Sequence, residues 1–205
     1  PPKSMKTMIL QNWMNAFKKP TYFIEMEMSP RQIWSRFVMI ENKWTHEQLE
    51  QHYSQLQNGQ ENKFEYLTVD YSAPYPSDIE KKISMMETKP ELVVVDHMGL
   101  FKSKRQDNNM KVEEASQALM ELAVKYNVVV FAVSEISKSA FKEGMDISSS
   151  RGSFRVAYNA NKLLSLAPYR NKETNLIEMI HVKSDKNREK EFLNVRLNVN
   201  NVRIE

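Results

Sequence analysis

Two short runs of this sequence are apolar at every position, and they restrict its fold more than any other feature. Residues 92–95 read Leu-Val-Val-Val, and residues 128–133 read Val-Val-Val-Phe-Ala-Val. A strand that is apolar on both faces must be covered on both faces, which is typical of the parallel sheets of α/β proteins. Parallel strands need a long crossover between them. Residues 112–126, between the two runs, carry apolar side chains at helical spacing and predict that crossover helix.

Helical and strand patterns alternate over the first two thirds of the chain. Helices are expected at 6–18, 30–40, 45–56, 77–86 and 112–126, and strands at 22–26, 64–69, 92–95 and 128–133. Ser29 before Pro30, and Thr45 with Gln48, predict helix starts. After a polar loop at 138–150 and an irregular segment to 161, strands follow at 163–166, 177–182 and 192–197. We predict a single α/β domain over 1–205, a mostly parallel sheet with helices on both faces and a C-terminal antiparallel hairpin.

Composition excludes several kinds of site. The 205 residues include no cysteine, so disulfides, thiolate zinc sites, iron–sulfur clusters and cysteine nucleophiles are excluded. The four histidines have no HExxH spacing. No apolar run approaches the length of a membrane helix, so we expect a soluble, cytoplasmic protein. A net charge of +3 is too small to indicate nucleic-acid binding by itself.

The N-terminal residues end in a phosphate-binding pattern. Residues 1–7 read Pro-Pro-Lys-Ser-Met-Lys-Thr and run directly into a predicted helix. Lys6 and Thr7 fit the last two places of the Walker A pattern G-x-x-x-x-G-K-S/T, whose Lys contacts phosphates and whose hydroxyl binds Mg²⁺. Met5 replaces the second glycine, and the first would precede Pro1, so we expect a fragment that starts inside the loop. The alternative is that the Lys-Thr pair only begins a helix.

Acidic residues follow two of the predicted strands. Asp96 comes directly after the apolar strand 92–95, as in a Walker B motif, and would hold Mg²⁺ through water. The alternative is a helix-capping Asp. Glu27 follows strand 22–26 at the same sheet edge and could activate an attacking water, although Glu25 would point to the same face. His97, next to Asp96, is interpreted as a polar neighbour of this site.

The order of these blocks resembles the C-terminal RecA-like ATPase domain of DnaB-type replicative helicases, including phage versions. The resemblance covers nearly the whole chain and is carried by residues 3–7, 23–29, 92–100 and 128–138. It implies a RecA-like P-loop fold, and Glu27 as the catalytic base. By the same match ATP binds through Ser4, Met5, Lys6, Thr7, Asp96 and Glu135, and Mg²⁺ through Thr7 and Asp96.

The resemblance also implies residues that act on a neighbouring subunit and on DNA. Ser134 and Glu135 stand where the family has a Ser-Gln phosphate sensor. Lys186 and Arg188 match a pair that reaches the neighbour's nucleotide, although counting from the preceding strand suggests Lys183. The implied DNA contacts are Lys102, Lys104, Arg105, Lys142, Arg151 and Arg155. A solvated surface is the alternative for any one of these basic residues.

The implied function is an ATP-driven replicative helicase motor that moves along single-stranded DNA as a homohexameric ring, with ATP and Mg²⁺ between subunits. Its partners would be single-stranded DNA, its own copies, and a primase or helicase loader, in the host cytoplasm for a phage protein. The alternative is a RecA-fold nucleotide-dependent assembly, loader or recombination protein without unwinding activity. Met5 and Glu135 favour this alternative because both depart from the family pattern.

Overall fold

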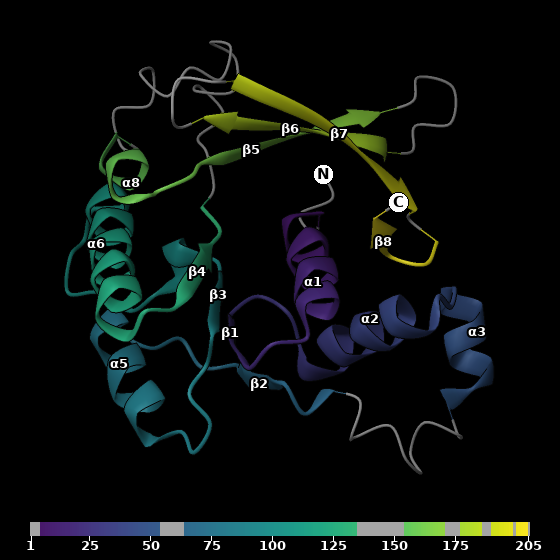
Figure 1. Ribbon diagram of the computed structural model, residues 1–205, viewed down its shortest axis with the longest axis horizontal. Helices are drawn as coiled ribbons and strands as arrows, with labels where there is room; N and C mark the ends of the chain where they lie inside the picture. Colours follow the sequence, from purple (N-terminus) through teal and green to yellow (C-terminus); the bar gives the residue numbers. More distant parts are fainter. Residues whose placement is uncertain are drawn as a thin grey trace. The chain divides into compact units, whose positions relative to one another are not determined.

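Figure 1 shows the computed structural model of the chain, which describes residues 5–53, 64–134, 154–170, 177–185, 190–198 and 200–204. The chain forms two compact units, each built from segments that are separate in the sequence. The first unit contains Pro1–Lys18, Met28–Glu65 and Lys162–Glu205, and the second contains Lys19–Glu27 and Tyr66–Asn161.

The second unit is built on a four-stranded parallel sheet. Its strands are β1 (Thr21–Glu25), β2 (Leu67–Asp70), β3 (Leu92–Asp96) and β4 (Val129–Ala132), in the order β2-β1-β3-β4. Every residue of the two central strands, β1 and β3, is buried. This confirms the predicted α/β class with a mostly parallel sheet. The apolar run at 128–133 was expected to be covered on both faces, but β4 lies at the edge of this four-stranded sheet and is partly exposed, with Val129 57% exposed.

Helices α5 (Pro76–Met85) and α6 (Asn108–Tyr126) pack against one face of this sheet. The core on this face combines alternate strand residues with apolar helix residues. They are Tyr22 and Ile24 of β1, Val93 and Val95 of β3, Ile79 and Ile83 of α5, and Leu119 and Leu122 of α6. The 3-10 turn η2 (Met98–Leu100) follows β3. The segment expected to be irregular contains a short helix, α8 (Phe154–Asn159), which the amide of Asn159 ties to Ser116 Oγ of α6 at 3.1 Å.

Three helices are described for the first unit: α1 (Met5–Phe17), α2 (Pro30–Asn42) and α3 (His46–Gln51). Two of them, α2 and α3, begin at the predicted caps. Ser29 and Gln32 form a capping box at the start of α2, and Thr45 and Gln48 form another at the start of α3. The third helix is shorter than the predicted 45–56, since it ends at Gln51.

An aromatic cluster fills part of the first unit. The rings of Trp34, Phe37 and Phe64 lie with centroids 5.7 to 6.2 Å apart. Phe64 was expected to open a strand, but β2 begins only at Leu67. The ring packs with α2 instead, because a large aromatic side chain gains more from burial among other rings than from a strand end.

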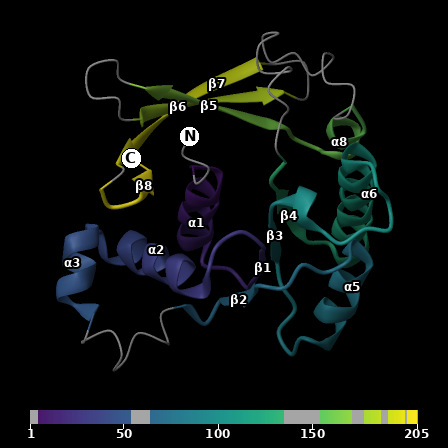
Figure 2. The same cartoon turned by 180° about the vertical axis from the view of Figure 1, so that it is seen from behind.

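The first unit also holds a four-stranded antiparallel sheet, β5-β6-β7-β8, formed by β5 (Leu164–Arg170), β6 (Ile177–Asp185), β7 (Lys190–Asn198) and β8 (Arg203–Ile204). The predicted terminal hairpin is therefore confirmed and extended by one strand on each side. Figure 2 shows β8 beside α1, where the Asn12 amide donates to Val202 O at 2.8 Å and accepts from Ile204 N–H at 3.2 Å. No helix in the described part of the chain is long and apolar enough to cross a membrane.

Asp70, at the end of β2, is the centre of a polar network in the second unit. Its carboxylate accepts hydrogen bonds from the Tyr22 hydroxyl at 2.6 Å, from Ser72 N–H at 2.9 Å, from the Ser72 hydroxyl, and from the Lys82 ammonium. Burial alone would raise the pKa of Asp70, but the hydrogen bonds from Lys82, Ser72 and Tyr22 outweigh it and lower that pKa to about 2. Burial and the bond to Asp70 raise the pKa of Tyr22.

We expect Asp70→Asn to lower the free energy of unfolding by about 2 kcal/mol at pH 7. The folded pKa lies below the unfolded value of about 4, so this stabilisation is present above pH 4 and is lost as the pH falls towards 2. Denaturant unfolding of the two proteins at pH 7 and near pH 2.5 measures the difference.

Asp107→Asn is the matched control, because Asp107 caps α6 through Met110 N–H and Asn caps helices about as well. If Asp70→Asn lowers the free energy of unfolding by the same amount at both pH values, the role given to the charged network is contradicted.

Candidate functional site

The carboxyl edge of the parallel sheet gathers several acidic residues. The register of β1 and β3 places Glu25 beside Asp96, and the next residue, Met26, donates its N–H to Asp96 O at 3.0 Å. Both carboxylates are almost fully buried, with residue exposures of 1% and 2%. In α/β proteins ligands bind beyond this edge of the sheet. Asp96 therefore lies at the position that its place after an apolar strand predicted.

Glu25 and Glu27 have different surroundings. Glu25 Oε1 accepts the backbone N–H of Glu27 at 2.8 Å, so the buried carboxylate holds the chain as it leaves β1. Burial and the negative charge of Glu25 raise the pKa of Tyr71, which follows β2 at the same edge. The Glu27 side chain is 29% exposed. Of the two glutamates, Glu27 thus has the carboxylate that a water and a substrate can reach.

His97 contacts Glu27 directly. Its Nε2 atom lies 2.9 Å from Glu27 Oε1, and its Nδ1 atom accepts the N–H of Gly99 at 3.1 Å. Sequence reasoning placed His97 near the site but identified no partner for it. The only sequence signal was its position directly after Asp96, because a contact between two loops that follow different strands depends on how those strands pair.

The predicted phosphate-binding residues lie in the first turn of α1, in the first unit. Thr7 is 2% exposed and Lys6 is half-buried. The first turn contains no acidic residue. The backbone N–H groups at a helix start and the helix dipole favour an anion there. This end of α1 therefore suits a phosphate group, with Lys6 as the countercharge.

Each unit offers side chains whose chemistry, taken by itself, suits phosphate or Mg²⁺. Within the ranges that the structure describes, no group of three or more His, Cys, Asp or Glu side chains could hold a metal by itself. Mg²⁺ does not need one, since it is commonly bound by one or two protein oxygens together with substrate phosphates and waters. The hydroxyl of Thr7 and the carboxylate of Asp96 are oxygen donors of the type that Mg²⁺ prefers.

Four of the residues predicted to contact DNA are described, and all four are exposed in the second unit: Lys102, Lys104, Arg105 and Arg155. Lys102, Lys104 and Arg105 belong to the loop between η2 and α6. Ser103 shapes this loop, because its hydroxyl donates to Glu114 Oε2 at 2.7 Å and accepts Arg105 N–H at 3.0 Å. Arg155, on α8, lies 3.6 Å from Glu113 Oε2 with 76% of its side chain exposed.

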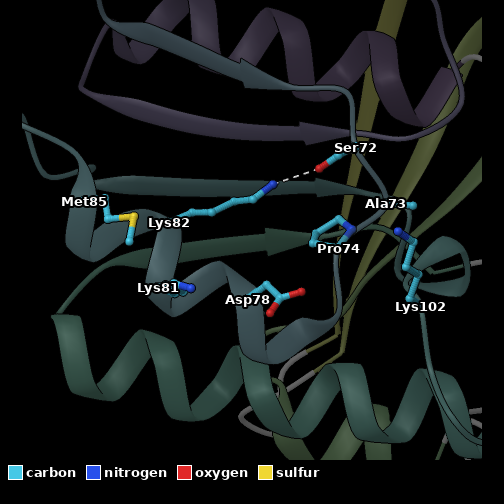
Figure 3. Close-up of a pocket in the computed structure, with 8 residues that line it drawn as sticks. All are labelled: Ser72, Ala73, Pro74, Asp78, Lys81, Lys82, Met85 and Lys102. Atoms are coloured by element: carbon cyan, nitrogen blue, oxygen red, sulfur yellow. Dashed lines mark hydrogen bonds between the residues drawn. The ribbon is translucent and has the colours of Figure 1, made fainter.

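Lys102 also lines a hollow of about 350 Å³, which Figure 3 shows. Two further lysines line it, Lys81 and Lys82 of α5, together with Ser72, Ala73, Pro74, Asp78 and Met85. The Lys82 ammonium is hydrogen-bonded to Ser72 Oγ at 2.8 Å, and Lys102 N–H donates to Pro74 O at 3.0 Å. Sequence reasoning missed Lys81 and Lys82, because they approach Lys102 only through the folding of α5 against the sheet.

Several predicted site residues lie outside the described residues: Ser4, Glu135, Lys142, Arg151, Lys186 and Arg188. The backbone of Met5 begins α1, and Lys183, the alternative to Lys186, lies on β6.

Comparison with known proteins identifies relatives of this arrangement. A family model described as "DnaB-like helicase C terminal domain" matches residues 2–202. No curated protein sequence matches the chain.

Solved structures similar to the chain have low sequence identity. One, described as an ATPase domain, has a TM-score of 0.77 at 15% identity and covers 99% of this chain and 81% of its own. A DnaB-like replicative helicase, described with its interactions with primase, has a TM-score of 0.73 at 16% identity, over 99% of this chain and 55% of its own. A KaiC-like protein from Pyrococcus horikoshii has a TM-score of 0.59 at 13% identity, over 98% and 83%. These likenesses establish the RecA-like fold.

Proposed function

The chain belongs to the DnaB-like helicase C-terminal domain family, and from this premise we propose that residues 1–205 form one ATP-hydrolysing motor domain of a replicative helicase, which moves along single-stranded DNA. The observation that carries the proposal is the partly exposed Glu27 carboxylate at the carboxyl edge of the parallel sheet, where buried Asp96 ends the neighbouring strand. This edge is where α/β folds bind nucleotides.

The roles proposed for the residues follow from their chemistry. Lys6 neutralises phosphate charge, with Ser4 and Met5 contributing backbone N–H groups at the start of α1 and Glu135 near the γ-phosphate. Thr7 and Asp96, the latter through water, would hold Mg²⁺, which would neutralise charge on the phosphates when bound. Glu27 accepts a proton from water as the water oxygen attacks the γ-phosphorus, and ADP leaves.

The proposal includes assembly and partners. A homohexameric ring would place ATP between subunits, with Lys186 and Arg188 contacting the nucleotide of the adjacent subunit. An Arg suits this role because its planar, permanently charged group binds phosphate oxygens in pairs. The similarity to a DnaB-like helicase described with primase supports a primase as a partner. A helicase loader is the other partner proposed. We expect such a motor to act on DNA in the cytoplasm.

DNA contacts are proposed for Lys102, Lys104, Arg105, Lys142, Arg151 and Arg155. Exposed basic side chains on loops suit sequence-independent contacts with the phosphate backbone. Lys81 joins this set, because it lines the same hollow as Lys102. Lys82 is less suited, since its ammonium is already bound by Asp70 and Ser72.

Glu27→Gln should reduce ATP hydrolysis at least about 100-fold, because Gln cannot accept the proton of the attacking water. Binding of ATP should change little. Hydrolysis of ATP is measured with and without single-stranded DNA, and nucleotide affinity is measured by titration. Strong stimulation of the unmodified protein by DNA is expected.

Unchanged turnover in Glu27→Gln would contradict the assignment of the base. Nucleotide binding and self-assembly without DNA-stimulated turnover of the unmodified protein would instead support a RecA-fold assembly or loader protein.

Lys81→Ala and Lys102→Ala should each weaken binding of single-stranded DNA to a similar extent for all sequences. Loss of one phosphate contact should also lower the slope of log affinity against log salt by about 1. Titration of labelled oligonucleotides at several salt concentrations measures both effects.

Lys19→Ala is the matched control. Lys19 lies at the opposite, amino-terminal edge of the sheet. Its Nζ atom is 3.9 Å from Glu91 Oε1, and both side chains are exposed. If the slope of log affinity against log salt changes in neither Lys81→Ala nor Lys102→Ala, the proposed DNA contact at the hollow is contradicted.

Arg188→Ala subunits mixed with Lys6→Ala subunits should recover part of the ATP hydrolysis that each variant lacks alone. Recovery is expected because a mixed ring contains interfaces at which both the phosphate-binding Lys6 and the neighbour's Arg188 are intact. Turnover is measured over a series of mixing ratios, and no recovery at any ratio would contradict action across subunits.

A further inference from the structure

We infer that His97 is a positioning residue for the catalytic base: its ring N–H donates a hydrogen bond that holds the Glu27 carboxylate in place. The inference rests on the proposed role of Glu27 in ATP hydrolysis. It is carried by the distance of 2.9 Å between His97 Nε2 and Glu27 Oε1, in side chains that are 12% and 29% exposed.

The hydrogen bonds of the imidazole define its tautomer. Gly99 N–H can only donate, so the His97 Nδ1 atom that it approaches at 3.1 Å must accept and carries no hydrogen. In a neutral ring the hydrogen is then on Nε2. This atom faces Glu27 Oε1, so it is the ring N–H that donates to the carboxylate.

The backbone segment that carries the ring is held by hydrogen bonds to the sheet. Met98 N–H donates to Val133 O at 2.9 Å, and Val133 N–H donates to Val95 O at 2.9 Å. These bonds fix both ends of the short segment that carries His97. The turn η2 adds a bond from Leu100 N–H to His97 O at 3.0 Å. His97 is thus anchored to β3 and to the end of β4, whereas Glu27 follows β1.

Holding one carboxylate oxygen has a consequence for catalysis. A glutamate side chain on a loop samples several rotamers, and only some direct an oxygen at the attacking water. With Oε1 bound to His97, the second oxygen, Oε2, is left in a restricted orientation to accept the proton. The expected result of removing the donor is a slower chemical step, with nucleotide binding unchanged.

His97→Phe keeps an aromatic ring but removes the donor, and should lower kcat for ATP roughly tenfold while KM changes little. His97→Gln keeps an N–H donor on a side chain of similar length, and should retain most of kcat. Thermal unfolding shows whether the variants are equally folded. A kcat for His97→Phe equal to that of the unmodified protein, or equal losses in His97→Phe and His97→Gln, would overturn the inference.

Gly99→Ala is a second test that leaves His97 unchanged. A Cβ atom at position 99 would lie 3.0 Å from His97 Cε1 and 3.1 Å from Nδ1, so the ring must shift by a few tenths of an ångström. We expect kcat to fall in this variant with KM nearly unchanged. A kcat equal to that of the unmodified protein would count against the inference.

Nitrogen-15 NMR of the histidine rings tests the contact without using activity. His97 should show the Nε2–H tautomer, with its signal assigned by its disappearance in His97→Gln. Glu27→Ala should remove the protection of this Nε2 proton from exchange with solvent. An Nδ1–H tautomer, or protection that is the same in Glu27→Ala, would overturn the inference even if Glu27→Gln abolishes hydrolysis. Full activity of Glu27→Gln would instead contradict the proposed function, whatever the tautomer.

Discussion

The parallel pairing of β1 with β3 is the constraint on which the candidate site depends. These two strands are buried at every residue, so their backbone groups must satisfy one another in the sheet. Their register sets Glu25 beside Asp96, and the hydrogen bond from Met26 to Asp96 continues the pairing to the last residue of β3. The two loops that leave these strands therefore start side by side, at the edge where the charged residues lie.

Local hydrogen bonds give the charged residues at this edge different roles. Glu25 is buried and binds the backbone of Glu27, so its carboxylate shapes the loop. Glu27 remains partly exposed, and His97 binds one of its oxygens. A buried carboxylate without such partners would be costly to ionise. The Glu27 N–H supplies one such partner to Glu25 Oε1, and the Glu27 side chain itself stays partly exposed.

The likeness to solved RecA-like structures at 13 to 16% identity has a related explanation. A parallel sheet needs apolar residues of suitable size in its strands and on the helices that cover them, and many sequences meet this need. The pattern of burial is therefore retained where individual residues are not. The chemistry of the site depends instead on a few positions, which a likeness of folds does not establish.

The sequence by itself determined the elements whose signals are local. The apolar runs at β3 and β4, the N-cap of α2, the capping box of α3, and the positions of Asp96 and Glu27 after their strands were all readable from short segments. The tertiary structure alone decided which distant residues meet. The strand β8 and the short helix α8 are too short to produce a periodic pattern, and they are held by contacts with α1 and α6. The contact of His97 with Glu27, and the approach of Lys81 to Lys102, likewise depend on strand register and helix packing, which no short segment encodes.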